Sequence, residues 1–214
     1  MKTLATTIFL IFATLVSAIA QNSGYEKAMK KALTEMEAAQ SPDAMLASAN
    51  TFERIGQKAK DEYLPSYYAA LNLLNHNWTL QDPAARDAEI DRAMEHIKKA
   101  EELAPGNDEV EVLNGYALMA KMTVDPMNRG QSYSPRIMQS FGKAMAMNPQ
   151  NPRAKIMMAQ MELGTAQYMG TDTKKPCELA RQGAELLKNE KPSDELQPKW
   201  GMESAEEILK GCNQ

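Results

Sequence analysis

The sequence is poor in the residues from which most catalytic and metal sites are built. Its 214 residues include only two histidines, His76 and His96, and two cysteines. Neither histidine has a second ligand three or four residues away, so a zinc site is not expected. The sequence also lacks a G-x-S-x-G nucleophile motif and a glycine-rich phosphate loop. We therefore expect a non-enzymatic protein with no metal and no cofactor.

The chain also lacks a block of basic residues and, beyond residue 20, a long apolar run. Its net charge is −4, and an acidic balance repels phosphate backbones, so we expect no nucleic-acid partner. No later segment approaches the 18 apolar residues of a membrane span. Aromatic residues make up 6% of the chain, strand alternation is absent, and alanine and methionine are abundant. This composition favours helix-on-helix packing.

The first 20 residues have the pattern of a secretory signal peptide. Lys2 precedes an apolar stretch over residues 4–16, and Ala18-Ile19-Ala20 is a small-x-small cleavage site. The run is short for a transmembrane anchor, although an uncleaved anchor is the alternative. We expect a signal peptide at 1–20 and one mature domain at 21–214, exported in soluble form to the periplasm or beyond.

Helical periodicity runs through nearly all of the mature sequence. Prolines at positions 42, 83, 105, 126, 149, 152 and 192 end or begin the segments. Long connections are expected at 78–86 and 124–133, on one edge of the molecule. The predicted helices lie near residues 24–39, 43–60, 62–77, 86–104, 108–123, 134–147, 152–169, 175–189 and 199–211.

One stretch of this pattern repeats. Residues 88–107 reappear in degenerate form at 132–151, and their closing prolines, Pro105 and Pro149, stand 44 residues apart. A fixed period of 20 to 50 residues is typical of a stacked array, in which each unit buries its apolar face against a neighbour. We expect an all-α fold, an α–α superhelix of about four helical hairpins and a C-terminal capping helix.

The spacing within this repeat resembles the tetratricopeptide repeat family. That family places an alanine five residues before its closing proline, a bulky residue eight before it and a small residue about ten after it. The matching residues are Ala100 and Ala144, Ile97 and Phe141, and Gly115 and Ala159. The unit departs from the family in length, 44 residues against the usual 34, and we place the extra residues in the long connections. HEAT-like hairpins are the structural alternative.

The chain is also similar to exported bacterial proteins with long-looped arrays of this kind. The shared phrases are RG-x-x-YSP at residues 129–135 and NPRA at residues 151–154. The resemblance implies a binding scaffold and no reaction.

Methionine and cysteine each leave two interpretations open. Met119 with Met122 and Met158 with Met161 are spaced i, i+3. Such thioethers could bind Cu(I), but methionine more often fills irregular cores. Cys177 and Cys212 in an exported chain predict one disulfide between the last two helices, against the alternative of two free buried thiols.

The leading functional hypothesis is protein or peptide binding on a concave surface lined by the helices at 62–77, 108–123 and 152–169. Amide side chains suit extended peptide backbone, because they both donate and accept hydrogen bonds. The aromatic group of Tyr63, Tyr67, Tyr68 and Trp78 is read as core. The solvent-facing candidates for partner binding are Asn72, Asn75, Asn114, Lys121, Lys155 and Gln160.

The alternative is a small-molecule or glycan-binding accessory protein that uses the long-loop edge. Its candidate residues are Asp125, Arg129 and Tyr133. An Arg129 paired with Asp125 and with backbone carbonyls would be architectural, whereas an Arg129 projecting into an open pocket would favour ligand binding.

Overall fold

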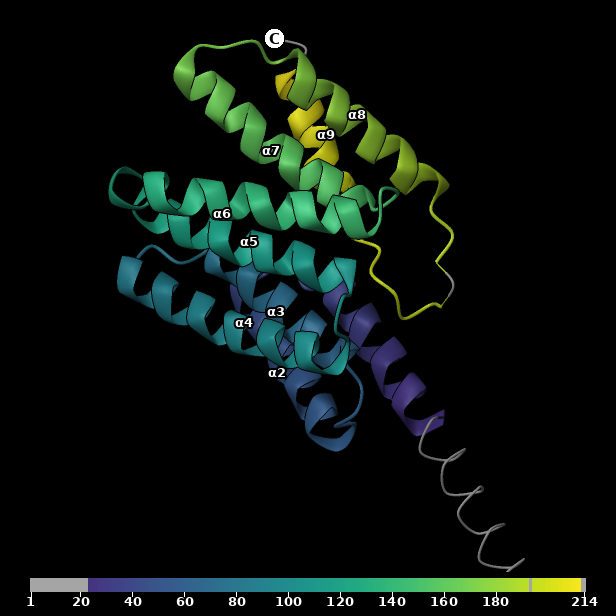
Figure 1. Cartoon of the computed structure of the whole chain (residues 1–214). Coiled ribbons are helices and arrows are strands. Elements are labelled where there is room, and N and C mark those ends of the chain that lie inside the picture. The colour runs from purple at the N-terminus through teal and green to yellow at the C-terminus, as the bar shows by residue number, and fades with distance from the viewer. Residues whose placement is uncertain (1–22, 193, 213–214) are drawn as a thin grey trace, which may run out of the picture.

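The computed structural model describes residues 23–192 and 194–212, so the predicted signal peptide lies outside the described residues. These residues form helices and connections without a strand, which confirms the all-α prediction (Figure 1). None of the described helices is long and apolar enough to cross a membrane. Residues 23–37 form an N-terminal helix. It is followed by α2 (Pro42–Lys58), α3 (Leu64–Asn77), α4 (Pro83–Leu103), α5 (Asp108–Val124), α6 (Pro126–Met147), α7 (Pro152–Met169), α8 (Lys174–Asn189) and α9 (Met202–Gly211).

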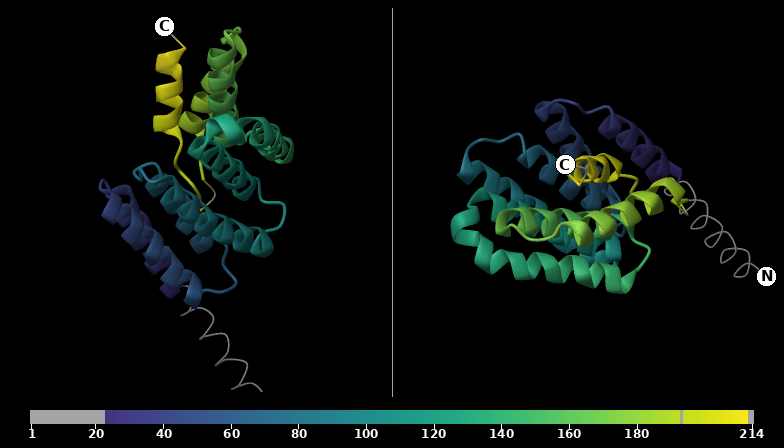
Figure 2. Two further views of the ribbon diagram at one scale, coloured as in Figure 1. Left: turned by 90° about the vertical axis from the view of Figure 1, so that its left-hand side faces the viewer. Right: turned by 90° about the horizontal axis from the view of Figure 1, so that it is seen from above.

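The helices stack as a superhelix of consecutive pairs. Each of α2 to α8 packs on the next helix, and α3, α5 and α7 also contact one another in that order. Because this second set of contacts brings α3, α5 and α7 close together, they form the inner layer, and α4, α6 and α8 lie outside it. The last helix, α9, packs on α7 and α8, where it stands at one end of the stack (Figure 2).

Polar caps followed by prolines set where several helices begin. The side chains of Ser41, Asp82, Asn107 and Asn151 each accept a hydrogen bond from a backbone N–H three residues later. A proline stands in the first turn of α2, α4 and α7, where its missing N–H costs nothing. These caps explain why the predicted starts at 43, 108 and 152 agree with the structure to within one residue.

The prediction of a long loop at 124–133 is wrong, and so is the helix start at 134. α6 begins at Pro126, with Asp125 as its cap, and Pro135 lies inside the helix. Pro135 is tolerated because this turn is exposed, so that water can bond the Gln131 carbonyl, which loses its helical N–H partner. α4 likewise begins at Pro83 rather than at 86. The extra residues of the repeat therefore lengthen the outer helices.

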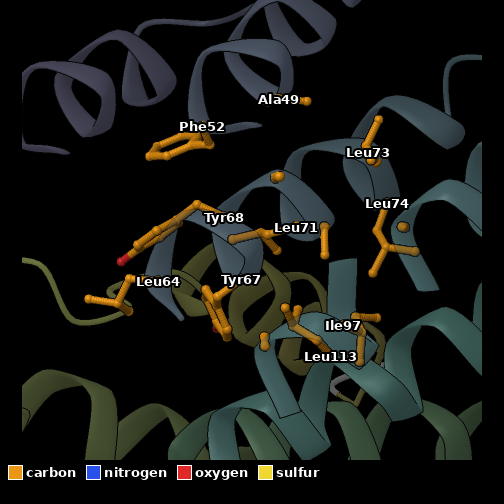
Figure 3. Close-up of a cluster of buried hydrophobic side chains, with 14 of the residues drawn as sticks. Ala49, Phe52, Leu64, Tyr67, Tyr68, Leu71, Leu73, Leu74, Ile97 and Leu113 are labelled. Atoms are coloured by element: carbon orange, nitrogen blue, oxygen red, sulfur yellow. The ribbon is translucent and has the colours of Figure 1, made fainter. Parts of the chain in front are cut away.

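The core follows the small and bulky positions of the repeat. Ala100, Ala144 and Ala159 are fully buried, and Tyr67, Tyr68, Leu71 and Leu74 form a cluster between layers (Figure 3). A Cβ atom added at Gly115 would lie 2.4 Å from Cε1 of Phe141. Position 115 therefore requires glycine for the aromatic ring to pack against the α5 backbone.

Gly115→Ala is expected to destabilise the protein by about 1–3 kcal/mol, because the ring of Phe141 must shift in a filled core. Urea unfolding followed by circular dichroism measures this change. Gly164→Ala is the matched control, since a Cβ there meets nothing within 4 Å. It should stabilise α7 by about 0.5–1 kcal/mol through helix propensity. Equal effects of the two substitutions would contradict the close contact at Gly115.

Candidate ligand site on the inner face

The segment between α8 and α9 crosses the inner face of the superhelix. We call its residues 190–192 and 194–201 the C-terminal strap; in Figure 1 it descends from α8 toward the N-terminal helices before it turns into α9. The Tyr68 hydroxyl donates to the Leu196 carbonyl at 2.7 Å, and in Figure 3 this hydroxyl points out of the buried cluster. The Trp200 indole N–H donates to the Tyr67 hydroxyl at 2.7 Å. The strap is therefore a fixed part of the inner surface.

A buried arginine anchors the end of the strap. The Arg153 side chain is only 3% exposed and pairs with Glu109 at 2.9 Å and with Glu190 at 2.5 Å. It also donates to the Trp200 carbonyl. Burial raises the pKa of Glu109, and the nearby Arg153 charge opposes that shift. The NPRA phrase thus places the residue that joins α5, the end of α8 and the strap.

An open cleft of about 410 Å³ lies between the strap and the N-terminal helix. This volume is within the usual range for small-molecule sites, roughly 300–1,000 Å³. We call it the strap cleft. Apolar and aromatic side chains contribute to its wall, and two lysines, Lys30 and Lys199, are exposed along it. The lining residues are Lys30, Leu33, Thr34, Met36, Glu37, Tyr68, Glu195, Gln197, Lys199 and Trp200.

A second, smaller hollow shares Trp200 with the strap cleft. Its volume is about 100 Å³, below that of usual ligand sites. The Tyr116 and Trp200 rings stack with centroids 6.3 Å apart, and the Trp78 indole donates to the Tyr116 hydroxyl at 2.7 Å. Trp78, read from sequence as core, is 43% exposed. The inner face therefore carries an aromatic row centred on Trp200.

Of the six predicted partner-binding residues, the structure brings two together. Asn75 and Gln160 are exposed and line the smaller hollow. The prediction that all six face solvent is wrong for Asn72 and Lys121, which are buried. Asn72 donates to the Tyr68 carbonyl within its own helix.

Of the other three residues, Lys121 and Asn114 make contacts between neighbouring helices, and Lys155 does not. Lys121 pairs with Asp87 at 3.1 Å and with Asp91 at 2.7 Å, both on α4. Asn114 donates to the Ser140 hydroxyl of α6. Lys155 borders an open hollow toward α8. Inner-layer helices have neighbours on several sides, so a polar residue on them often packs between layers.

The three residues predicted for the long-loop edge, Asp125, Arg129 and Tyr133, all contact other residues of the protein. Arg129 donates to both carboxylate oxygens of Asp87, at 2.7 and 2.6 Å, and to the Lys121 carbonyl. Its hydrogen bonds lower the pKa of Asp87 to about 2. Asp125 caps α6, and the half-buried Tyr133 packs against the core with the Arg136 guanidinium over its ring. Arg129 is thus placed as in the architectural interpretation, with Asp87 in the role expected of Asp125.

The two histidines, and the methionines considered as copper ligands, also contact other residues outside the strap cleft. His76 lies 2.6 Å from Glu89 and His96 lies 2.8 Å from Glu53, and neither lines the strap cleft. Within the described residues, no group of three or more histidine, cysteine or acidic side chains is placed to hold a metal ion. Met119, Met158 and Met161 are buried in one apolar cluster, the position expected of core filler.

The predicted disulfide is confirmed: Cys177 and Cys212 are bonded, joining α8 to α9. The strap lies between these helices, so the bond holds its far end. The strap cleft was not predicted from the sequence, where most of the strap has the pattern of a plain connection. The available signal was a stretch with Pro192, Pro198 and Trp200, without helical periodicity, enclosed by the two cysteines.

Comparisons with known proteins bear on the fold. No family model matches the sequence, and no curated protein matches it either. Among solved structures, the chain is similar to the HusA haemophore from Porphyromonas gingivalis, with 25% sequence identity and a TM-score of 0.78. The match covers 88% of this chain and 92% of the haemophore. The helical superhelix of this chain is therefore shared, over nearly its whole length, with a protein that is described as a haemophore.

Proposed function

We propose that this chain binds a flat, partly apolar small molecule, a tetrapyrrole such as haem, in the strap cleft. It would act as a non-enzymatic exported accessory protein that carries its ligand without transforming it. The likeness to the HusA haemophore supports the ligand class. The observation that carries the proposal is the strap cleft itself, where aromatic and apolar walls meet two lysines.

The chemistry of the cleft suits such a ligand. A tetrapyrrole like haem has a broad apolar ring with carboxylates on one edge. Trp200 offers aromatic surface for the ring, and Leu33 and Met36 complete the apolar side. Tyr68 is 1% exposed, so it supports this wall from behind. Lysine ammonium groups make charge-assisted hydrogen bonds with carboxylates. Ring burial and charge pairing therefore act at separate parts of the same cleft.

The iron of haem contributes little to binding in this proposal. Among the described residues, those that line the cleft include neither histidine nor cysteine. Burial raises the pKa of Tyr68, whose hydroxyl already donates to Leu196, so ligation by its phenolate is disfavoured. Met36 is the remaining soft donor. We therefore expect metal-free protoporphyrin to bind nearly as tightly as haem.

Substitutions of aromatic and apolar residues in the wall of the strap cleft test the proposal. Trp200→Ala and Leu33→Glu should each weaken haem binding by roughly tenfold or more, since burial of a large apolar side chain contributes about 1.5–3 kcal/mol. The measurement is an absorbance titration with haem and with protoporphyrin. Trp78→Ala is the control, because Trp78 does not line the cleft. Leu33→Glu leaves the hydrogen bonds of the strap intact and so separates lost binding from a displaced strap. Equal affinity in all these proteins would contradict the site.

Protein or peptide binding is the second candidate. The strap occupies the inner face through backbone carbonyls, at Leu196 and Trp200, as an extended peptide would. A peptide partner would have to displace it or bind beside it, so we place this function second.

We also propose that the array is related to tetratricopeptide repeats. The burial of Ile97, Phe141 and the matching small residues supports that relation.

A further inference from the structure

A carboxylate of the protein itself already pairs with one of the two lysines of the strap cleft. Glu195 of the strap lies 2.6 Å from the Lys30 ammonium of the N-terminal helix. Lys199 is close enough for its charge to favour the ionised Glu195. Glu195 thus lies near two cations that line the cleft, one from each of its sides.

The ion pair between Lys30 and Glu195 is exposed and therefore weak. The two side chains are 52% and 73% exposed, and exposed ion pairs typically contribute only about 0–1 kcal/mol. By contrast, the strap is held at Leu196, Trp200 and Glu190 by bonds to buried or half-buried partners. Glu195 can therefore release Lys30 while the strap keeps its position.

The other acidic groups near these lysines do not replace Glu195. Glu26 and Asp194 act on Lys30 only through their charge, whereas Glu195 also makes a hydrogen bond. Asp194 accepts the backbone N–H of Leu196. Glu37 lines the same cleft without an ion pair to Lys30.

We propose that Lys30 and Lys199 form the carboxylate-binding end of the strap cleft, and that Glu195 is an internal competitor for them. The preferred ligand is then a planar carboxylic acid whose acidic edge displaces Glu195 when it binds. This inference rests on the proposed function for the planar part of the ligand. The new element is the preference for a charged ligand, which arises because a carboxylate of the ligand replaces the Glu195 carboxylate at the lysines.

The test compares protoporphyrin IX with its dimethyl ester, which keeps the ring and removes the charges. Glu195→Gln should strengthen binding of the acid by about 2–5-fold, the equivalent of a surface ion pair, and leave the ester unchanged. Lys30→Met and Lys199→Met should each weaken binding of the acid and leave binding of the ester unchanged. Glu35→Gln is the matched control, because Glu35 pairs with Lys31 and does not line the cleft.

The outcomes separate this inference from the proposed function. If acid and ester bind the cleft equally and Glu195→Gln changes neither, the competitor role is overturned while the planar-ligand site stands. Weaker acid binding by Glu195→Gln also overturns it, because Glu195 would then support the site. Binding of neither compound to the wild-type protein or to Glu195→Gln overturns both proposals.

Discussion

Replacing Arg153 with methionine should lower the free energy of unfolding by about 3–5 kcal/mol, the usual cost of leaving a buried carboxylate without its partner. Arg153 is 3% exposed, and its main partner Glu109 is 12% exposed. Methionine keeps much of the volume and removes the charge and all the hydrogen bonds. Urea unfolding at neutral pH measures the change. Arg181→Met is the control, since Arg181 forms an exposed pair with Glu178 one helical turn away.

A second substitution identifies the cause of the loss. Adding Glu109→Gln to Arg153→Met removes the unpaired charge and should restore part of the lost stability. Arg153→Met should also loosen the strap, because Arg153 binds both Glu190 and the Trp200 carbonyl. An Arg153 variant within about 1 kcal/mol of the Arg181 control would contradict the role of the buried network.

Removal of the disulfide is the other large expected effect. Cys177→Ser with Cys212→Ser should destabilise the protein by about 3–4 kcal/mol, from the chain entropy of the loop that the bond closes. The bonded cysteines are 35 residues apart in sequence. Thermal unfolding should show a midpoint lower by roughly 10 °C.

Reductant provides the matched comparison for this variant. It should shift the wild-type protein to the same midpoint and leave the double serine variant unchanged. An unchanged midpoint of the wild-type protein after complete reduction would contradict a stabilising role for the bond. Haem affinity measured on the same samples shows whether the strap needs α9 held in place.

Local patterns were enough to predict the helices and the disulfide. Proline after a capping side chain identified the starts of α2 and α7, whereas the same signal at Pro83 and Pro126 was not taken as a start. An even cysteine count in a chain with a predicted export signal identified the disulfide pair. The 44-residue period also has a direct structural counterpart. Glu109 and Arg153 are 44 residues apart, and Asp87 and Arg129 are 42 apart. Polar contacts therefore join near-equivalent positions of successive repeats.

The same patterns failed where the outcome depends on the tertiary environment. Pro135 has the signature of a helix start, but Asp125 and Pro126 provide an earlier one, and the exposed turn tolerates the second proline. Asn72 and Lys121 are polar residues on inner helices, and periodicity could not tell a solvent-facing position from one between layers. The tetratricopeptide relation and the signal peptide stay predictions.

The strap cleft could not be predicted because its walls are distant in sequence. The N-terminal helix contributes Lys30 and Leu33, α3 contributes Tyr68, and the strap contributes Trp200. Helical periodicity reports which residues share a face of one helix, and it contains no information on how an irregular segment crosses the stack. The bonds from Tyr67, Tyr68 and Arg153 that position the strap arise only in the folded chain.

A crystal structure of the protein with bound haem, with the iron located from its anomalous signal, tests the central proposal most directly. We predict one iron peak in the strap cleft, with the ring against Trp200 and the carboxylates toward Lys30 and Lys199. An iron peak beside Arg129 and Tyr133, an iron bound by His76 or His96, or no peak in crystals grown with saturating haem would contradict it.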